Sequence, residues 1–224
     1  MSIVIRSGLS FELPPYVHNN LILWADSEYG LNGNIIKNLV DSTKYDLTIN
    51  GNLPYSNKGL TFNGNVNNYI TVPAFDELAN TNEFTCEMAI YATNINTTQR
   101  ILFIYNFFEF FIRYNKAWTD MHFDGLPREQ FTGDINRGFN TFTSVYKANE
   151  YNKFYVNGIQ VASKTAVNPD STPTIGSIGQ GQNKYPAANG TKFYTMRVYN
   201  RALSSDEILI NRNIDVKRFA GGVE

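Results

Sequence analysis

The sequence is poor in charge, and it holds a single cysteine and only two histidines. Charged residues make up 17% of the 224 residues, well below the usual quarter. The net charge of -1 gives no electrostatic footprint for nucleic acid or for an anionic membrane, so we expect neither as a partner. The lone Cys86 cannot form an intrachain disulfide, which argues against small secreted proteins held together by disulfides. Because Cys86 stands in an apolar run, we expect it to be a small core residue.

Long apolar runs are missing as well. The first 11 residues carry Arg6 and lack the continuous apolar core of a signal peptide, and no stretch is long enough to span a membrane. We therefore expect a protein made and folded in a cytoplasm. Release from the cell by lysis, or by another route, stays open.

Asparagine and aromatic residues are abundant instead. About one residue in eight is Asn, and the chain has 14 Tyr and 16 Phe. Asn and Gly favour turns, whereas aromatic residues favour strands, so this composition predicts many short strands joined by tight turns. Together these signals predict an all-β sandwich or barrel.

Several strands can be placed from the pattern. Residues 84–90 alternate, with Phe84, Cys86, Met88 and Ile90 on one side, which predicts a half-buried strand. Residues 100–105 and 107–114 are apolar on both faces, as in central strands or in strands whose outer face meets a partner. Residues 141–147 and 153–161 form a further pair, and Asn157-Gly158 predicts a tight turn that folds residues 154–156 onto 160–162.

Helix signals are sparse. Ser204 and Glu207 form a capping box, which predicts a helix of one or two turns. Residues 75–80 fit a single turn. We divide the chain into an N-terminal arm or lead-in strand (1–20), one domain (21–218) and a tail (219–224).

Several blocks resemble one family. Residues 154–162, 174–179 and 196–208 are similar to the last hairpin, strand and short helix of laminin-G-like and concanavalin A-like lectin jelly rolls. Residues 21–27 and 60–72 resemble the early strands of the same domains. Phe139 departs from the family, whose members usually have Trp there. The resemblance spans residues 20 to 213 and is to the variety found in bacteriophage virion proteins and bacterial surface proteins. It implies a jelly-roll β-sandwich with one short C-terminal helix.

Catalytic patterns are absent from the sequence. Glycanases of this fold carry carboxylates at alternate positions of one strand, whereas Glu87 and Glu109 each stand alone. No Gly-x-Ser-x-Gly elbow accompanies His18 or His122. We therefore predict a protein that is not an enzyme.

Residues 118–124 form the strongest candidate ligand site. Alternation places Trp118, Asp120, His122 and Asp124 on one face of a strand. A sugar ring can stack on a large aromatic side chain while carboxylates bind its hydroxyls, so this face is a candidate glycan site. The alternative is a solvated face, or one covered by a loop or a neighbouring subunit.

Two weaker sets of candidates remain. Many relatives with this fold hold a calcium ion at an edge of the sandwich, and Asp26, Asp41 and Asp134 stand in turn-like settings that could supply ligands. We expect no other cofactor. If Phe108 and Phe110 point inward, Phe107 and Phe111 flank Glu109 on the outer face, as candidates for an oligomer or partner contact. The alternative is that a loop or second sheet covers them.

The hypothesis from the sequence is a non-enzymatic binding or structural module of a bacteriophage virion, attached to capsid or tail, with a lectin-like domain for host-surface glycan. Its localisation would be the virion, after synthesis in the host cytoplasm. Its partners would be other virion or surface proteins, a neutral glycan and, in one version, further copies of itself. Two alternatives stay open: a bacterial carbohydrate-binding lectin, in the cytoplasm or at the cell surface, and a structural virion component without a ligand.

Overall fold

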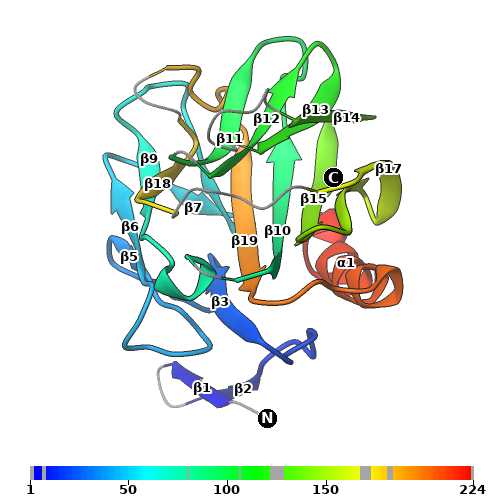
Figure 1. The fold of residues 1–224 in the computed structure, drawn as a ribbon. Coiled ribbons are helices and arrows are strands. Elements are labelled where there is room, and N and C mark those ends of the chain that lie inside the picture. Colours follow the sequence, from blue (N-terminus) through cyan, green and yellow to red (C-terminus); the bar gives the residue numbers. More distant parts are fainter. Residues whose placement is uncertain are drawn as a thin grey trace.

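Two antiparallel sheets pack face to face in a sandwich, and a C-terminal helix lies against one of them (Figure 1). The computed structural model describes residues 3–6, 9–79, 81–105, 107–121, 129–166, 173–180 and 184–222. The predicted all-β sandwich with one C-terminal helix is confirmed within these residues.

Sheet I lies beside the helix, and its strands follow the order β17-β16-β15-β10-β19-β8-β7, with β3 paired to β19. The bounds of its strands are β3 Leu21–Asp26, β7 Tyr55–Ser56, β8 Gly59–Thr61, β10 Glu83–Ala92, β15 Gly138–Lys147, β16 Tyr151–Val156, β17 Ile159–Lys164 and β19 Lys192–Tyr199. The predicted hairpin of β16 and β17 is confirmed. Asn157 and Gly158 form its turn with positive φ angles of 53° and 78°.

Sheet II forms the other layer, in the order β14-β13-β12-β11-β18-β9-β6-β5-β4. The bounds of its strands are β4 Leu31–Asn32, β5 Ile35–Ile36, β6 Leu47–Asn50, β9 Tyr69–Val72, β11 Gln99–Ile104, β12 Phe108–Arg113, β13 Lys116–Met121, β14 Glu129–Asp134 and β18 Gly176–Ile178. The strands predicted to be apolar on both faces, β11 and β12, are central strands of this sheet.

The main core fills the space between the two sheets. Alternate residues of β10, among them Phe84, Met88 and Ile90, face it as predicted. The strand is not half-buried, however, because its opposite face is covered too. Thr85 and Glu87 are buried on that side, where the C-terminal helix packs.

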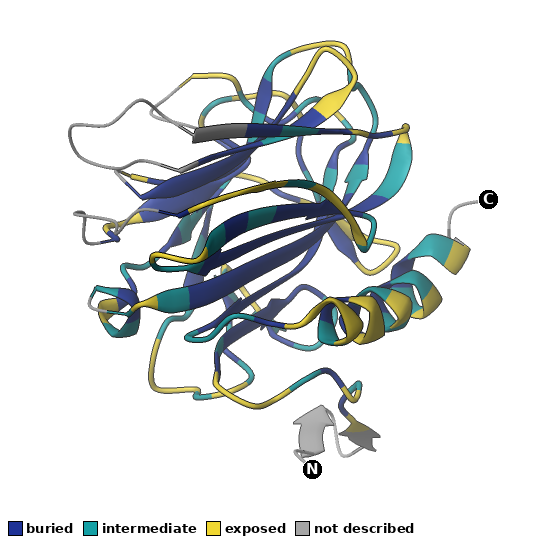
Figure 2. Ribbon diagram, turned by 45° about the vertical axis from the view of Figure 1, so that its right-hand side comes forward, coloured by how far each residue is buried: buried dark blue, intermediate teal, exposed yellow. Residues whose placement is uncertain are grey.

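Helix α1 spans Ser205–Phe219 and is longer than the predicted one or two turns. The capping box of Ser204 and Glu207 is confirmed at its start. Its buried side includes Ile208, Asn211, Asp215 and Phe219, at helical spacing, while the other side faces solvent (Figure 2). Phe219 stacks on Tyr194 with ring centroids 4.6 Å apart, so the predicted tail begins too early. Short 3-10 turns are η1 Asp76–Leu78 and η2 Ala220–Gly222.

The N-terminal segment divides near Glu12. In the part of the chain that the structure describes, β1 Ile3–Arg6 and β2 Leu9–Glu12 pair only with each other, apart from the two sheets (Figure 1). Leu13 and Tyr16, in contrast, are buried in a cluster with Trp24. Residues 13–20 therefore belong to the domain rather than to the predicted arm.

None of the helices among the described residues combines the length and the apolar character needed to cross a membrane.

Candidate functional site

The outer face of sheet II, turned away from the core, carries the candidate site. Along β9, Ile70 and Val72 point into the core while Tyr69 and Thr71 point outward. The strand register extends this outer row sideways, because Thr71 pairs with Ser177 of β18, which pairs with Phe103 of β11. Residues from three distant parts of the sequence thus meet on one surface.

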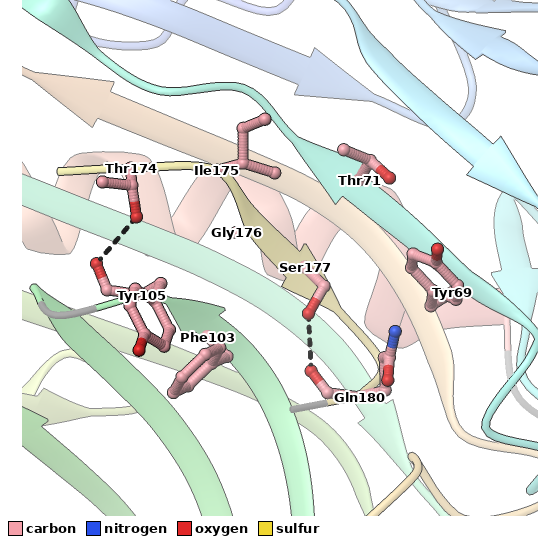
Figure 3. Close-up of a pocket in the computed structure, with 9 residues that line it drawn as sticks. All are labelled: Tyr69, Thr71, Phe103, Tyr105, Thr174, Ile175, Gly176, Ser177 and Gln180. Carbon is pink, nitrogen blue, oxygen red and sulfur yellow. Dashed lines mark hydrogen bonds between the residues drawn. The ribbon is translucent and has the colours of Figure 1, made fainter. Parts of the chain in front are cut away.

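This surface is hollowed into an open groove of about 420 Å³, which we call the aromatic groove (Figure 3). Three aromatic side chains line it together with small and uncharged polar residues. The lining residues are Tyr69, Thr71, Phe103, Tyr105, Thr174, Ile175, Gly176, Ser177 and Gln180. All nine are uncharged.

Hydrogen bonds hold the walls of the aromatic groove. Thr174 Oγ1 donates to the carbonyl oxygen of Tyr105 at 3.2 Å, and Ser177 Oγ donates to that of Gln180 at 2.8 Å. Gly176 lets β18 approach β11 closely, since a Cβ there would lie 2.4 Å from the carbonyl oxygen of Phe103. The groove is therefore shaped by the packing of β18 between its neighbours.

A second hollow, of about 230 Å³, lies further along the same face, and we call it the charged pocket. Both hollows are built on β11, because Phe103 lines the aromatic groove and Arg100 lines the charged pocket. The lining residues of the charged pocket are Thr98, Arg100, Glu109, Phe111, Arg113, Asp120 and Tyr185. The guanidinium of Arg100 lies over the ring of Phe103 at 5.0 Å, so the two hollows adjoin.

Two carboxylates meet in the charged pocket. Glu109 on β12 and Asp120 on β13 are directly opposed in the strand register, and both side chains are buried. Arg100 Nε donates to Glu109 Oε2 at 2.5 Å, which pairs the charge of Glu109. Glu109 was predicted to stand alone on its strand, but Asp120 of the neighbouring strand lies beside it.

Of the predicted glycan face on residues 118–124, only residues 118–121 lie among the described residues. Trp118 and Asp120 lie on the outer side of β13, while Ala117 faces the core, as alternation predicts. Trp118 is half-buried, with its ring 5.6 Å from that of Phe111, and its Nε1 donates to the carbonyl oxygen of Arg113 at 3.1 Å. His122 and Asp124 lie outside the described residues. The glycan role of this face stays a prediction.

The placement of Phe107 as an outer partner contact is wrong. Phe107 lies in the turn before β12, and its side chain is buried in the core, 5.1 Å from the ring of Phe84. The strand begins one residue later, at Phe108. Phe111 does lie on the outer face, but Trp118 covers it and leaves it only 8% exposed.

The three candidate calcium ligands lie apart, each with another partner. Both carboxylate oxygens of Asp26 accept hydrogen bonds from Arg218, at 2.7 and 3.0 Å. Asp41 accepts from the hydroxyl and the amide of Thr43, and these bonds lower the pKa of its carboxyl.

Asp134 pairs with Lys116 at 3.2 Å. Among the described residues, no three His, Cys, Asp or Glu side chains gather as a metal site. Asp26, Asp41 and Asp134 therefore do not fit a shared calcium site.

Another concentration of charge is buried between sheet I and α1. Arg197 on β19 donates two hydrogen bonds to Asp215, at 2.9 and 2.6 Å, and one to Glu87, at 2.9 Å. Tyr16 donates to Asp215 at 2.5 Å, and burial raises the pKa of its hydroxyl well above the usual value. Because these side chains are closed off from solvent, the cluster joins the N-terminal segment, the helix and the sheet rather than binding a ligand.

A sandwich of two antiparallel sheets is the architecture of lectin-type jelly rolls. Residues 63–209 match the concanavalin A-like lectin/glucanases superfamily, and the chain belongs to it. The family and fold predicted from the sequence are therefore confirmed. No curated protein sequence matches the chain significantly.

Solved structures of toxin binding domains share the fold. One is from work stating that cell entry of botulinum neurotoxin type C depends upon interaction with two ganglioside molecules (10% identity, TM-score 0.70, 87% of this chain and 51% of that chain). Another is the binding domain of botulinum neurotoxin DC in complex with rat synaptotagmin II (11% identity, TM-score 0.69, 87% of this chain and 51% of that chain). A third is the binding domain of Paraclostridial Mosquitocidal Protein 1 (15% identity, TM-score 0.69, 87% of this chain and 52% of that chain). The chain spans about half the length of each.

Proposed function

We propose that the chain is a non-enzymatic binding module that holds a glycan on the outer face of sheet II. The observation that carries this proposal is the aromatic groove, whose lining combines rings with uncharged polar groups and contains no charge. Sugar rings stack on aromatic side chains, while hydroxyl, amide and backbone groups bind sugar hydroxyls. An open groove on a sheet also suits a glycan chain presented by a surface.

The comparisons support this proposal at the level of the fold. The superfamily includes lectins, two of the similar toxin structures are described as binding domains, and a third comes from work on gangliosides. We extend the proposal to a bacteriophage virion protein that adheres to host-surface glycan. The β1–β2 hairpin, which lies apart from the sheets, would be its attachment point on a capsid or tail protein.

Co-purification separates this role from its alternatives. A virion protein would sediment with purified particles, whereas a free bacterial lectin would not. A structural virion component would sediment with particles but bind no glycan.

The superfamily also contains glucanases, and Glu109 opposes Asp120 across two strands. Glycoside cleavage needs one carboxyl that carries a proton and one that does not. Glu109 Oε2 already accepts a hydrogen bond from Arg100 Nε at 2.5 Å, and this structural ion pair favours binding over cleavage. We expect no release of reducing sugar from neutral polysaccharides, and release that Glu109→Gln abolishes would overturn the non-enzymatic proposal.

A glycan array with matched variants tests the binding proposal. Tyr105 is 42% exposed in the aromatic groove, and Tyr55 is 45% exposed on β7 of sheet I, so Tyr55→Ala controls for loss of a surface tyrosine. We expect Tyr105→Ala to weaken binding about tenfold, because an aromatic contact at the centre of a site carries much of the affinity, and Tyr55→Ala to leave it unchanged. Trp118→Ala then reports whether the site extends to β13. A wild-type protein that binds no glycan, or equal effects of the two tyrosine variants, would contradict the proposal.

A further inference from the structure

The charged pocket continues the aromatic groove on the same sheet face but differs from it in chemistry. Its lining includes two arginines and two carboxylates, whereas the groove contains no charge. A ligand that extends along the outer face from Phe103 therefore meets ionic groups next. Whether the ligand meets a positive or a negative charge depends on which of the arginines and carboxylates are accessible.

Arg100 and Glu109 form an ion pair with each other. Their ion pair is 2.5 Å long, and both side chains are largely buried. The Arg100 guanidinium is also held between two rings, at 5.0 Å from Phe103 and 5.5 Å from Tyr185. This pair forms a rigid wall and contributes little net charge to a ligand.

Arg113 is the accessible charge of the pocket. Its side chain is exposed, and among the described residues it forms no ion pair. Its guanidinium rests on the ring of Tyr114, at 4.8 Å, and Nη2 reaches the hydroxyl of that tyrosine at 3.3 Å. Asp120, by contrast, is fully buried at the base of the pocket. A ligand therefore approaches an arginine and not a carboxylate.

We propose that the charged pocket binds a carboxylate-bearing sugar residue, such as a uronic or sialic acid, of the same glycan whose neutral part lies in the aromatic groove. Arg113 is the residue that binds the carboxylate. This inference rests on the proposed glycan-binding function and adds a ligand class to it.

The chemistry of the pocket favours a single negative charge. A guanidinium donates two parallel hydrogen bonds to a planar carboxylate. Among the described residues that line the pocket, the two arginines are matched by the two carboxylates Glu109 and Asp120, so a phosphate carrying two charges would meet more repulsion there than a carboxylate.

The distance along the strand is that of a chain rather than a single sugar. Glu109 and Arg113 stand on the same face of β12, four residues apart, which corresponds to about 13 Å. Because Glu109 pairs with Phe103 of the groove, Arg113 lies roughly this far from the groove along the strand. An oligosaccharide can reach both ends at once.

Matched probes that differ only in charge test the proposal. Binding of an oligogalacturonide is compared with that of its methyl ester, and binding of sialyllactose with that of lactose, by calorimetry on the full chain. We expect the acidic member of a pair to bind about tenfold more tightly, with a preference that weakens at high salt. Arg113→Gln should abolish the preference, because it removes the charge.

Lys116→Gln is the matched control, because Lys116 is an exposed cation directly opposite Arg113 in the strand register. It should leave the preference unchanged. A preference that survives Arg113→Gln, or that Lys116→Gln removes equally, would overturn the assignment of Arg113.

Tyr105→Ala distinguishes a failure of this inference from a failure of the proposed glycan function. This substitution should weaken binding of both the acidic and the neutral sugar of each pair. If it does so while no probe shows an acid preference, the charged-sugar site is wrong and the glycan function stands. If neither member of either pair binds the wild type, both are wrong.

Discussion

At the scale of single residues, Asp215 is the acid on which the buried cluster depends. It accepts two hydrogen bonds from Arg197 and one from Tyr16. We predict that Asp215→Asn lowers the free energy of unfolding by about 3–5 kcal/mol, because it leaves the buried Arg197 charge with a weakened set of partners. Urea denaturation followed by circular dichroism measures the change.

Asp134→Asn is the control at the surface. Asp134 pairs with Lys116, but its side chain is 89% exposed, so the same substitution should change the free energy of unfolding by no more than about 0.5 kcal/mol. Similar effects of the two substitutions would mean that burial does not govern the cluster.

Single residues also show where local sequence patterns are enough to predict whether a side chain is buried. Cys86 was expected in the core from its apolar surroundings, and it is buried there. Burial also raises the pKa of the Cys86 thiol well above its usual value, which suits an inert core residue. Phe107 was misplaced because it lies in the turn before β12, where the alternation of a strand does not apply.

At the scale of elements, the start of α1 links helix capping to pH. Hydrogen bonds from Arg201 lower the pKa of Glu207 to about 2, below its usual value of about 4.3. The folded state therefore favours the ionised form. The resulting stabilisation is complete above about pH 5 and is lost as the pH falls toward about 2.

We predict that Glu207→Gln flattens the decline of the free energy of unfolding between about pH 5 and 2, because Gln does not titrate. Arg201→Gln should flatten it as well, since it removes the main cause of the lowered pKa. Denaturation measured across this pH range tests both variants. An unchanged acid slope in both would show that the ion pair does not stabilise the folded state.

Elements with local signals were predicted, and the length of α1 was not. The capping box marks its start, and Asn157-Gly158 marks the β16–β17 turn, because both depend on neighbouring residues alone. The buried side of α1 includes Asn211 and Asp215, which are polar side chains that hydrogen-bond to partners on sheet I and in the N-terminal segment. A pattern of apolar residues cannot reveal such a helix face.

At the scale of the whole molecule, the N-terminal segment divides into a free part and a fixed part. We predict that deletion of residues 2–12 leaves the melting temperature nearly unchanged, because an isolated two-stranded hairpin adds little stability. Deletion of residues 2–17 should lower stability by about 3 kcal/mol or more, since it also removes the buried Leu13 and Tyr16. Thermal unfolding of the two variants measures the difference, and an equal loss in both would place the boundary elsewhere.

The candidate site belongs to this largest scale, and for that reason the sequence did not reveal it. The aromatic groove joins residues near positions 70, 104 and 176, and only the strand order β11-β18-β9 brings them together. The pairing of Glu109 with Asp120, in contrast, depends on a local signal. The two-residue turn at Tyr114 and Asn115, both with positive φ, fixes the register that opposes them.

The position of β19 in sheet I has a consequence for synthesis on the ribosome. This strand pairs with β3, β8 and β10, yet it follows all of them in the sequence and is the last strand among the described residues. The hydrogen bond of Tyr16 likewise needs Asp215, which is translated 199 residues later. The nascent chain therefore cannot complete the centre of sheet I until residues 192–199 have been translated. Until then one edge of β10 stays unpaired, and an unpaired strand edge is a site at which a nascent chain can aggregate.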